Sequence, residues 1–215
     1  MSTRLDSSPP EALAPIVVGA PPDLRNRPQG EAVTKGTGLL AARDFAEARY
    51  PSLWPAVLAK LSERTRACVQ RGVLPNGWYP LEDYIELVET LARLAPDPDT
   101  EVAAKFARWE VRRDLQGGIY RALLAIASPS MAIRVSARMW SLYHKSGRFR
   151  ATASGDFSAT LDVRFFAGSS SLFWHYILGF CEEVAELANA IEPRATLVEG
   201  GAEGDHYMVA ELVWR

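Results

Sequence analysis

The sequence predicts an α+β fold in which an N-terminal layer of helices precedes a β-hairpin, a long helix and a second β-hairpin. From Gly36 onward, apolar residues recur at spacings of three and four, which is typical of amphipathic helices. After Gly147 they alternate with polar residues, which is typical of strands that bury one face. Because a lone hairpin is only marginally stable, we expect the two hairpins to form one four-stranded antiparallel sheet beneath the long helix.

Residues 1–30 are expected to form a flexible leader, and residues 31–215 a single α+β domain. The leader is rich in proline, which interrupts helices and strand ladders. Its short apolar run Ile16-Val17-Val18 is open to docking as a strand or an anchor. With 215 residues, 48% of them hydrophobic and 23% charged, the chain can bury a full core without a metal or a disulfide.

The first helices are predicted between clear turn and start signals. A short helix at residues 39–46 is followed by a helix from Pro51 to Thr65. Pro80 suits the first position of the next helix, whose residues 81–91 carry the best-defined apolar face. That helix must end before Pro96, because proline disfavours a helical residue before it.

Three further helical stretches precede the change of period at Gly147. Asp99 or Thr100 can cap a helix that Gly117-Gly118 would loosen or break. Residues 119–126 continue in helical spacing. Pro129 then opens a helix for which a set of apolar side chains is expected to be buried: Ile133, Ala137, Trp140 and Leu142.

The C-terminal part is predicted to form a β-hairpin, a long helix and a second β-hairpin. Residues 149–153 and 159–165 form the first hairpin around the turn Ser154-Gly155-Asp156. Serines 169–171 can cap the long helix at residues 172–191, with Glu182, Glu183 and Glu186 on its solvent side. The second hairpin pairs residues 195–198 with 207–214 across a turn at 200–205.

Charge and composition exclude several classes of protein. A net charge of -2 and a pI near 6.0 argue against a nucleic-acid-binding surface. The cluster Arg108, Arg112 and Arg113 is interpreted as a solvated helix face, because Glu101 and Glu110 lie among these arginines. No apolar run reaches the roughly 18 residues of a membrane span, and residues 1–10 show no signal-peptide pattern.

Two cysteines in a chain of this size suggest a reducing compartment more than a disulfide scaffold. Cys68 and Cys181 both lie in apolar helical patterns. We therefore expect a cytoplasmic protein.

No catalytic or metal-binding constellation is recognisable, so we expect no enzyme, no metal and no cofactor. His144, His175 and His206 lack the convergent spacing of a zinc site and are interpreted as surface or hydrogen-bonded histidines. Serines 169–171 do not form a Gly-x-Ser-x-Gly elbow. Gly36-Thr37-Gly38 lacks the third glycine and the preceding strand of a dinucleotide fingerprint.

Short motifs give the chain a family resemblance from about residue 35 to 215. Lys35-Gly36, Trp78-Tyr79-Pro80-Leu81, Pro129 and the terminal Val213-Trp214-Arg215 resemble an uncharacterised domain family abundant in myxobacteria. The order of elements also looks like the superfold of NO-signalling and Golgi-transport ligand-binding domains. That superfold includes haem-NO-binding domains, vinyl-reductase-type sensor domains and palmitoyl-binding subunits of a vesicle-tethering complex.

The resemblance implies a hydrophobic cavity between the helices and the sheet, and homodimerisation. Haem-binding relatives use a helix histidine and a Tyr-x-Ser-x-Arg motif. Here Tyr143-His144-Lys145-Ser146-Gly147-Arg148 has one extra residue between Tyr and Ser, and no histidine precedes it. Vinyl-reductase-type relatives often carry a C-terminal cysteine cluster, whereas only Cys181 is present here. Haem or a metal held in these ways is therefore not expected.

A cavity of this kind would draw its walls from the long helix and the helices that face it. Tyr143 and Arg148 would supply polar groups at its mouth. The expected wall residues are Trp109, Leu123, Trp140, Phe173, Ile177, Phe180 and Cys181.

Two functions follow from this reading. One is a non-enzymatic sensor or carrier of an apolar small molecule. The alternative is a dimeric protein-interaction scaffold without a ligand, which would act through its surface or through residues 1–30.

Overall fold

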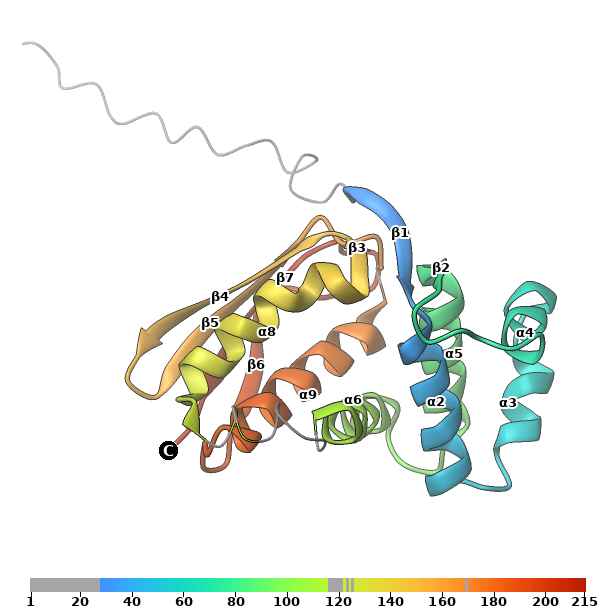
Figure 1. Ribbon diagram of the computed structural model, residues 1–215, viewed down its shortest axis with the longest axis horizontal. Helices are drawn as coiled ribbons and strands as arrows, with labels where there is room; N and C mark the ends of the chain where they lie inside the picture. The colour runs from blue at the N-terminus through green and yellow to red at the C-terminus, as the bar shows by residue number, and fades with distance from the viewer. Residues whose placement is uncertain (1–27, 116–121, 123, 125, 169) are drawn as a thin grey trace, which may run out of the picture.

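The computed structural model describes residues 28–115, 126–168 and 170–215, together with residues 122 and 124. Figure 1 shows a group of N-terminal helices beside a C-terminal sheet that two helices cover. In chain order the elements are β1 (Gly30–Lys35), α2 (Gly36–Arg49), α3 (Trp54–Lys60), α4 (Glu63–Gln70), β2 (Trp78–Pro80), α5 (Leu81–Leu94), α6 (Asp99–Leu115), α8 (Pro129–Tyr143), β3 (His144–Ser146), β4 (Arg148–Gly155), β5 (Ser158–Arg164), α9 (Ser171–Leu187), β6 (Arg194–Gly200) and β7 (Met208–Val213).

The two hairpins join into one antiparallel sheet of order β4-β5-β7-β6, which confirms the predicted four-stranded sheet. The central pairing sets Leu161 opposite Ala210 and Ala159 opposite Leu212, and all four side chains are buried. Their neighbours Thr160 and Glu211 face away from the core, as strict alternation requires. α8 contacts β4, and α9 contacts β6 and β7, so these two helices cover the apolar face of the sheet (Figure 1).

Serine caps define where several helices begin. Ser62, Ser128 and Ser170 each accept a hydrogen bond from the backbone N–H three residues on. Such caps satisfy N–H groups that have no partner inside the helix. The Ser62 cap also corrects one expectation, because the helix predicted from Pro51 to Thr65 is two helices, α3 and α4, which meet at Leu61 and Ser62.

Three other details differ from the sequence expectations. The long helix ends at Leu187 rather than at residue 191, since Asn189 adopts a left-handed φ of 68° and Ile191 is exposed. Leu142 is 56% exposed instead of buried, because it lies on the outer side of α8. Pro80 is the residue before α5 and the last of β2, not the first residue of the helix. The predicted helical stretch at 119–126 lies largely outside the described residues.

A small sheet that the sequence did not predict joins the two halves of the fold. Its order is β2-β1-β3, with Thr34 of β1 opposite both Tyr79 and His144. The backbone of Gln29 extends this connection, donating to the carbonyl of Phe165 and accepting from the N–H of Gly147. β1 therefore ties the N-terminal helices to the C-terminal sheet. Residues 1–27 of the predicted leader lie outside the described residues.

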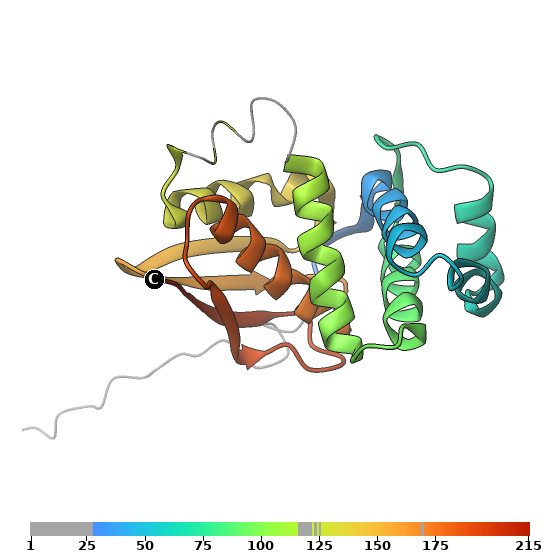
Figure 2. The same ribbon diagram turned by 90° about the horizontal axis from the view of Figure 1, so that it is seen from below.

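The contact between α6 and α9 forms the centre of the core. Figure 2 shows α6 running between the N-terminal helices and the C-terminal half. A close approach is possible because α9 has Gly179 at the crossing, where an added Cβ would lie 2.6 Å from the carbonyl oxygen of Ala104. None of the helices among the described residues is long and apolar enough to cross a membrane.

Ion pairs along this contact overturn the expectation that Glu182 and Glu183 are solvated. Glu183 is fully buried and accepts a hydrogen bond from Arg112 Nε at 2.5 Å, while Glu182 pairs with Arg108. Glu182 also accepts from the backbone N–H of Ala195 in β6 at 2.9 Å. Arg108 and Arg112 thus cross-link α6 to α9 instead of forming a purely solvated face. Glu186 is exposed, as expected.

Replacing Gly179 with alanine tests the close α6–α9 contact. Helix propensity alone would make Gly179→Ala stabilising by about 1 kcal/mol. The clash with Ala104 predicts the opposite sign, a loss of about 1–3 kcal/mol in the free energy of unfolding. Denaturant unfolding gives the value, with Ser141→Ala on the exposed side of α8 as a neutral control. A stabilised Gly179→Ala protein would contradict the packing described here.

Candidate ligand cavity

A cavity of about 100 Å³ lies where the N-terminal helices meet α8 and α9. The lining residues of α6, α8 and α9 recur at spacings of one, three and four, so each of these helices lines the cavity with one face. The lining also includes the partly exposed Lys35, Asp114 and Tyr143, so this side of the cavity faces solvent. Its apolar wall consists of Val111 and Leu115 of α6, Met139 and Trp140 of α8, Phe149 of β4, and Ile177 and Phe180 of α9.

A buried carboxyl group, Glu110, is the main polar feature of the cavity. Its side chain projects from α6 and is only 8% exposed. Tyr176 of α9 donates its hydroxyl to Glu110 Oε2 at 2.5 Å, and Tyr84 of α5 donates to the same oxygen at 3.3 Å. Three helices therefore meet at one carboxyl oxygen in the wall of the cavity.

Burial strongly favours the neutral form of this carboxyl. Desolvation raises the pKa of Glu110 to about 8, although the hydrogen bonds from Tyr176 and Tyr84 act in the opposite direction. No ion pair among the described residues includes Glu110, although the charge of the nearby Arg113 lowers its pKa in part. The pKa values of the two phenols are raised well above the usual value, mainly by burial and then by the nearby Glu110.

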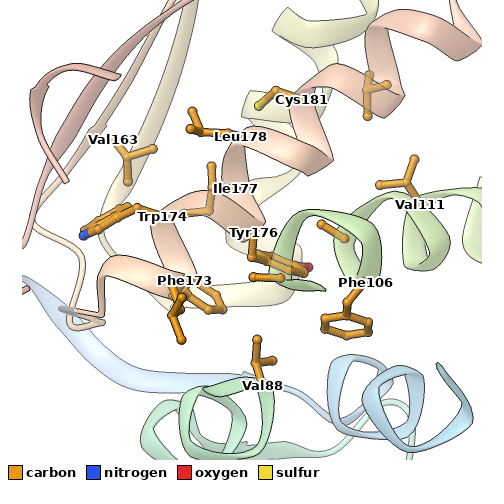
Figure 3. Close-up of a cluster of buried hydrophobic side chains, with 14 of the residues drawn as sticks. Val88, Phe106, Val111, Val163, Phe173, Trp174, Tyr176, Ile177, Leu178 and Cys181 are labelled. Atoms are coloured by element: carbon orange, nitrogen blue, oxygen red, sulfur yellow. The ribbon is translucent and has the colours of Figure 1, made fainter. Parts of the chain in front are cut away.

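Aromatic rings hold the tyrosines in place. Tyr176 stacks on Phe173 with ring centroids 4.9 Å apart and lies 5.5 Å from Phe106. Tyr84 meets Phe173 edge to face at 5.7 Å. Figure 3 shows Tyr176 pointing from α9 towards Phe106 on α6. This packing fixes the two hydroxyl groups relative to Glu110.

His144 supplies a second buried polar group. It directly follows α8, lines the cavity, and is 7% exposed. Its ring centroid lies 4.4 Å from that of Trp140, with the rings of Phe166 and Phe173 further out at 5.6 and 6.3 Å. Burial lowers the pKa of His144 to about 3, so the imidazole is neutral at physiological pH. Its Nδ1 has no hydrogen-bond partner among the described residues. The expectation of a surface position is therefore wrong for this residue.

The structure brings part of the predicted site together. Trp140, Tyr143, Ile177 and Phe180 all line the cavity. Phe173 does not line it, but packs against Tyr84 and Tyr176, which do. A binding role for these residues remains a prediction.

The other predicted site residues lie elsewhere. Trp109 packs against Phe45 of α2, and Arg148 lies over the ring of Phe165. Cys181 is fully buried outside the lining, and burial raises the pKa of its thiol. Leu123 lies outside the described residues.

Glu110 was assigned to a solvated face, and this is the main error of the sequence analysis at the site. The arginines around it dominated that interpretation. A usable signal was present, because Glu110 follows Phe106 by four residues and therefore shares its side of the helix with the apolar stripe of Val102 and Phe106. A carboxyl on an apolar stripe is a functional candidate.

Glu110 should make the stability of the protein fall as the pH rises through the neutral range. Between its ordinary pKa of 4.5 in the unfolded chain and about 8 in the folded protein, the folded state retains a proton that the unfolded state has lost. The free energy of unfolding should drop by on the order of 3–5 kcal/mol across this window. Glu110→Gln should remove this contribution.

Denaturant unfolding from pH 4.5 to 8.5 measures the effect as the difference between wild type and Glu110→Gln. Comparing the two cancels His144, whose lowered pKa gives the opposite slope between pH 3 and 6.5. Glu101→Gln, the same change at an exposed position of α6, should leave the profile unchanged. Parallel profiles for wild type and Glu110→Gln would refute a raised pKa at Glu110.

Solved structures with a similar fold are H-NOX domains. An unliganded Fe(II) H-NOX protein from K. algicida matches with a TM-score of 0.62 and 15% identity, over 84% of this chain and 96% of its own. An oxygen-binding H-NOX domain related to soluble guanylate cyclases matches with a TM-score of 0.60 and 12% identity, over 84% and 95%. No family model and no curated protein matches the chain. The similarity shows the fold and agrees with the expected α+β architecture.

The residues of this cavity do not fit haem, the group named for the H-NOX family. Its volume of about 100 Å³ is well below the roughly 300 Å³ at which pockets for drug-sized ligands begin. The imidazole of His144 lies among the rings of Trp140, Phe166 and Phe173. In addition, the buried carboxyl of Glu110 offers no positive charge to the propionates of a porphyrin. The chain is thus similar in fold to H-NOX domains but has a cavity that does not suit their haem.

Proposed function

We propose that this chain is a non-enzymatic small-molecule-binding domain, a sensor or carrier, whose site is the cavity between the helical layer and the sheet. The observation that carries the proposal is a largely apolar cavity in whose wall the polar side chains of Glu110, Tyr84, Tyr176 and His144 are buried. An apolar lining with a few fixed polar groups is typical of ligand sites.

The volume limits the ligand to a small molecule. An engineered apolar cavity of about 150 Å³ binds benzene, so a cavity of about 100 Å³ suits a ligand with only a few heavy atoms. Trp140, Ile177 and Phe180 would contact its apolar part, and Tyr143 would lie at the entrance. No step of a reaction is needed to explain the arrangement.

The position of the cavity supports a sensing role. β1 and α2 contribute Thr34, Lys35, Thr37 and Gly38 to the lining, while α8 and α9 contribute the opposite wall. A ligand would therefore touch both halves of the fold at once. A ligand shifts a conformational equilibrium only through such differential contacts.

Filling the cavity should abolish binding of a small probe. Isobutanol, with five heavy atoms, suits the volume and should produce saturable chemical-shift changes at cavity residues in NMR spectra of the full chain. Ser136→Leu places a larger side chain in the lining and should remove these changes. Ser141→Leu, the same substitution on the exposed side of α8, should leave them intact. Equal binding by both variants would count against this site.

We also propose that the protein forms a homodimer and resides in the cytoplasm. Met131, Val135 and Leu142 are 52%, 43% and 56% exposed, and they share one side of α8 that is turned away from the cavity. Burial of this stripe against a second copy would remove apolar surface from water.

The two described cysteines are unpaired, which is consistent with a reducing compartment such as the cytoplasm.

A charge in the α8 stripe should separate the two copies. Val135→Lys should convert a dimer to a monomer, because a lysine at the centre of an apolar contact is costly to desolvate. Ala48→Lys on the exposed side of α2 provides the matched control. Light scattering coupled to size exclusion gives the mass directly, and a monomeric wild-type protein would end the dimer proposal.

A further inference from the structure

Resting on the proposed binding function, we propose that the ligand is a small organic cation, a protonated amine or methylated ammonium, held between the Glu110 carboxylate and the aromatic rings of the cavity.

Among the residues that the structure describes, none forms an ion pair with the buried carboxyl, and Arg113 acts on it only from a distance. The neighbouring cations are engaged elsewhere: Arg113 pairs with Asp114 at 3.0 Å and with Asp44 at 3.2 Å. Lys35 lies over the ring of Trp78 at 4.3 Å and donates to the carbonyl of Asn76 at 3.0 Å. A buried charge is costly unless it is paired, so the protonated acid is favoured as long as no cation is bound. A cationic ligand would supply the missing partner.

Both tyrosines favour an ionised carboxyl once that partner is present. Tyr84 and Tyr176 donate their hydroxyl hydrogens to Glu110 Oε2, and donors of this kind stabilise the carboxylate form. The half of a binding site that an ammonium group needs is thus already assembled. An anionic ligand would meet the opposite situation, with Glu110 and Asp114 both in the lining.

The rest of the wall suits the organic part of such a ligand. Aromatic side chains from three helices and a strand surround the cavity, and cations bound among aromatic rings gain cation–π attraction that increases when water is excluded. The aromatic lining residues are Tyr84, Trp140, Tyr143, Phe149, Tyr176 and Phe180.

Protons should compete with the cation for Glu110. The groups that face this carboxyl are Tyr84 on α5, Tyr176 on α9, and Asp114 and Arg113 on α6. Across the cavity lie Lys35 on β1 and His144 on β3, and the latter stays neutral above about pH 3. Because the pKa of Glu110 in the free protein is about 8, cation binding should weaken up to tenfold for each pH unit below that value.

Two probes of equal size distinguish the effect of ligand charge on affinity from the effect of ligand shape. Isobutylamine stays protonated to about pH 10, as lysine does, and isobutanol is its neutral counterpart. At pH 8.5 isobutylamine should bind wild type at least tenfold more tightly than isobutanol, as measured by NMR titration of the full chain. The preference should disappear by pH 6, while the affinity for isobutanol should stay constant.

Variants assign the preference to one carboxyl. Glu110→Gln should remove the preference for the amine, whereas Glu101→Gln, on the exposed surface of α6, should retain it. If Glu110→Gln does not fold, the ¹³Cδ signal of Glu110 in wild type provides the same test. Its pKa should fall by at least one unit with isobutylamine and should not change with isobutanol.

The outcomes separate the two proposals. Equal affinities for isobutylamine and isobutanol, or tighter binding of isobutyrate, would overturn the cationic ligand and leave the binding function standing. If neither isobutylamine nor isobutanol binds wild type, both proposals fail.

Discussion

The close packing of α6 on α9 is the contact on which the rest of the structure depends. Gly179 allows the backbones to approach, and the pairs Arg108–Glu182 and Arg112–Glu183 fix how the helices lie along one another. With these pairs in place, Glu110 of α6 faces Tyr176 of α9. The wall of the cavity is thus a direct result of this one interhelical contact.

Glu110 illustrates a common compromise between stability and function. A glutamine or a leucine at this position would avoid the cost of burying an ionisable group. Local conflicts of this kind concentrate at functional sites, where a perturbed acid is useful and the surrounding core offsets its cost. The stacked rings of Phe173 and Tyr176 provide part of that compensation, since they bury a large apolar area beside the acid.

Periodic patterns made the regular elements predictable, whereas contacts between distant residues were not. Alternation after Gly147 identified both hairpins. Because an isolated hairpin is only marginally stable, the two were correctly predicted to share a sheet. The burial of Glu110, Glu182 and Glu183 was not predicted, because it depends on side-chain partners 26 to 74 residues away in the sequence. Four residues predicted for the site line the cavity, since helical spacing places them on inward faces. Glu110 was missed, although its spacing from Phe106 places it on the same apolar side of α6.

The position of β1 has a consequence for how the protein forms. This strand lies between β2 and β3, and its Thr34 pairs with His144, more than a hundred positions later in the chain. During synthesis at the ribosome, one edge of β1 stays unpaired until its partner strand β3, His144–Ser146, has emerged. Contacts between such distant segments slow folding, because the loop must close before the contact is gained. An exposed strand edge in the nascent chain is also a site at which chains associate incorrectly.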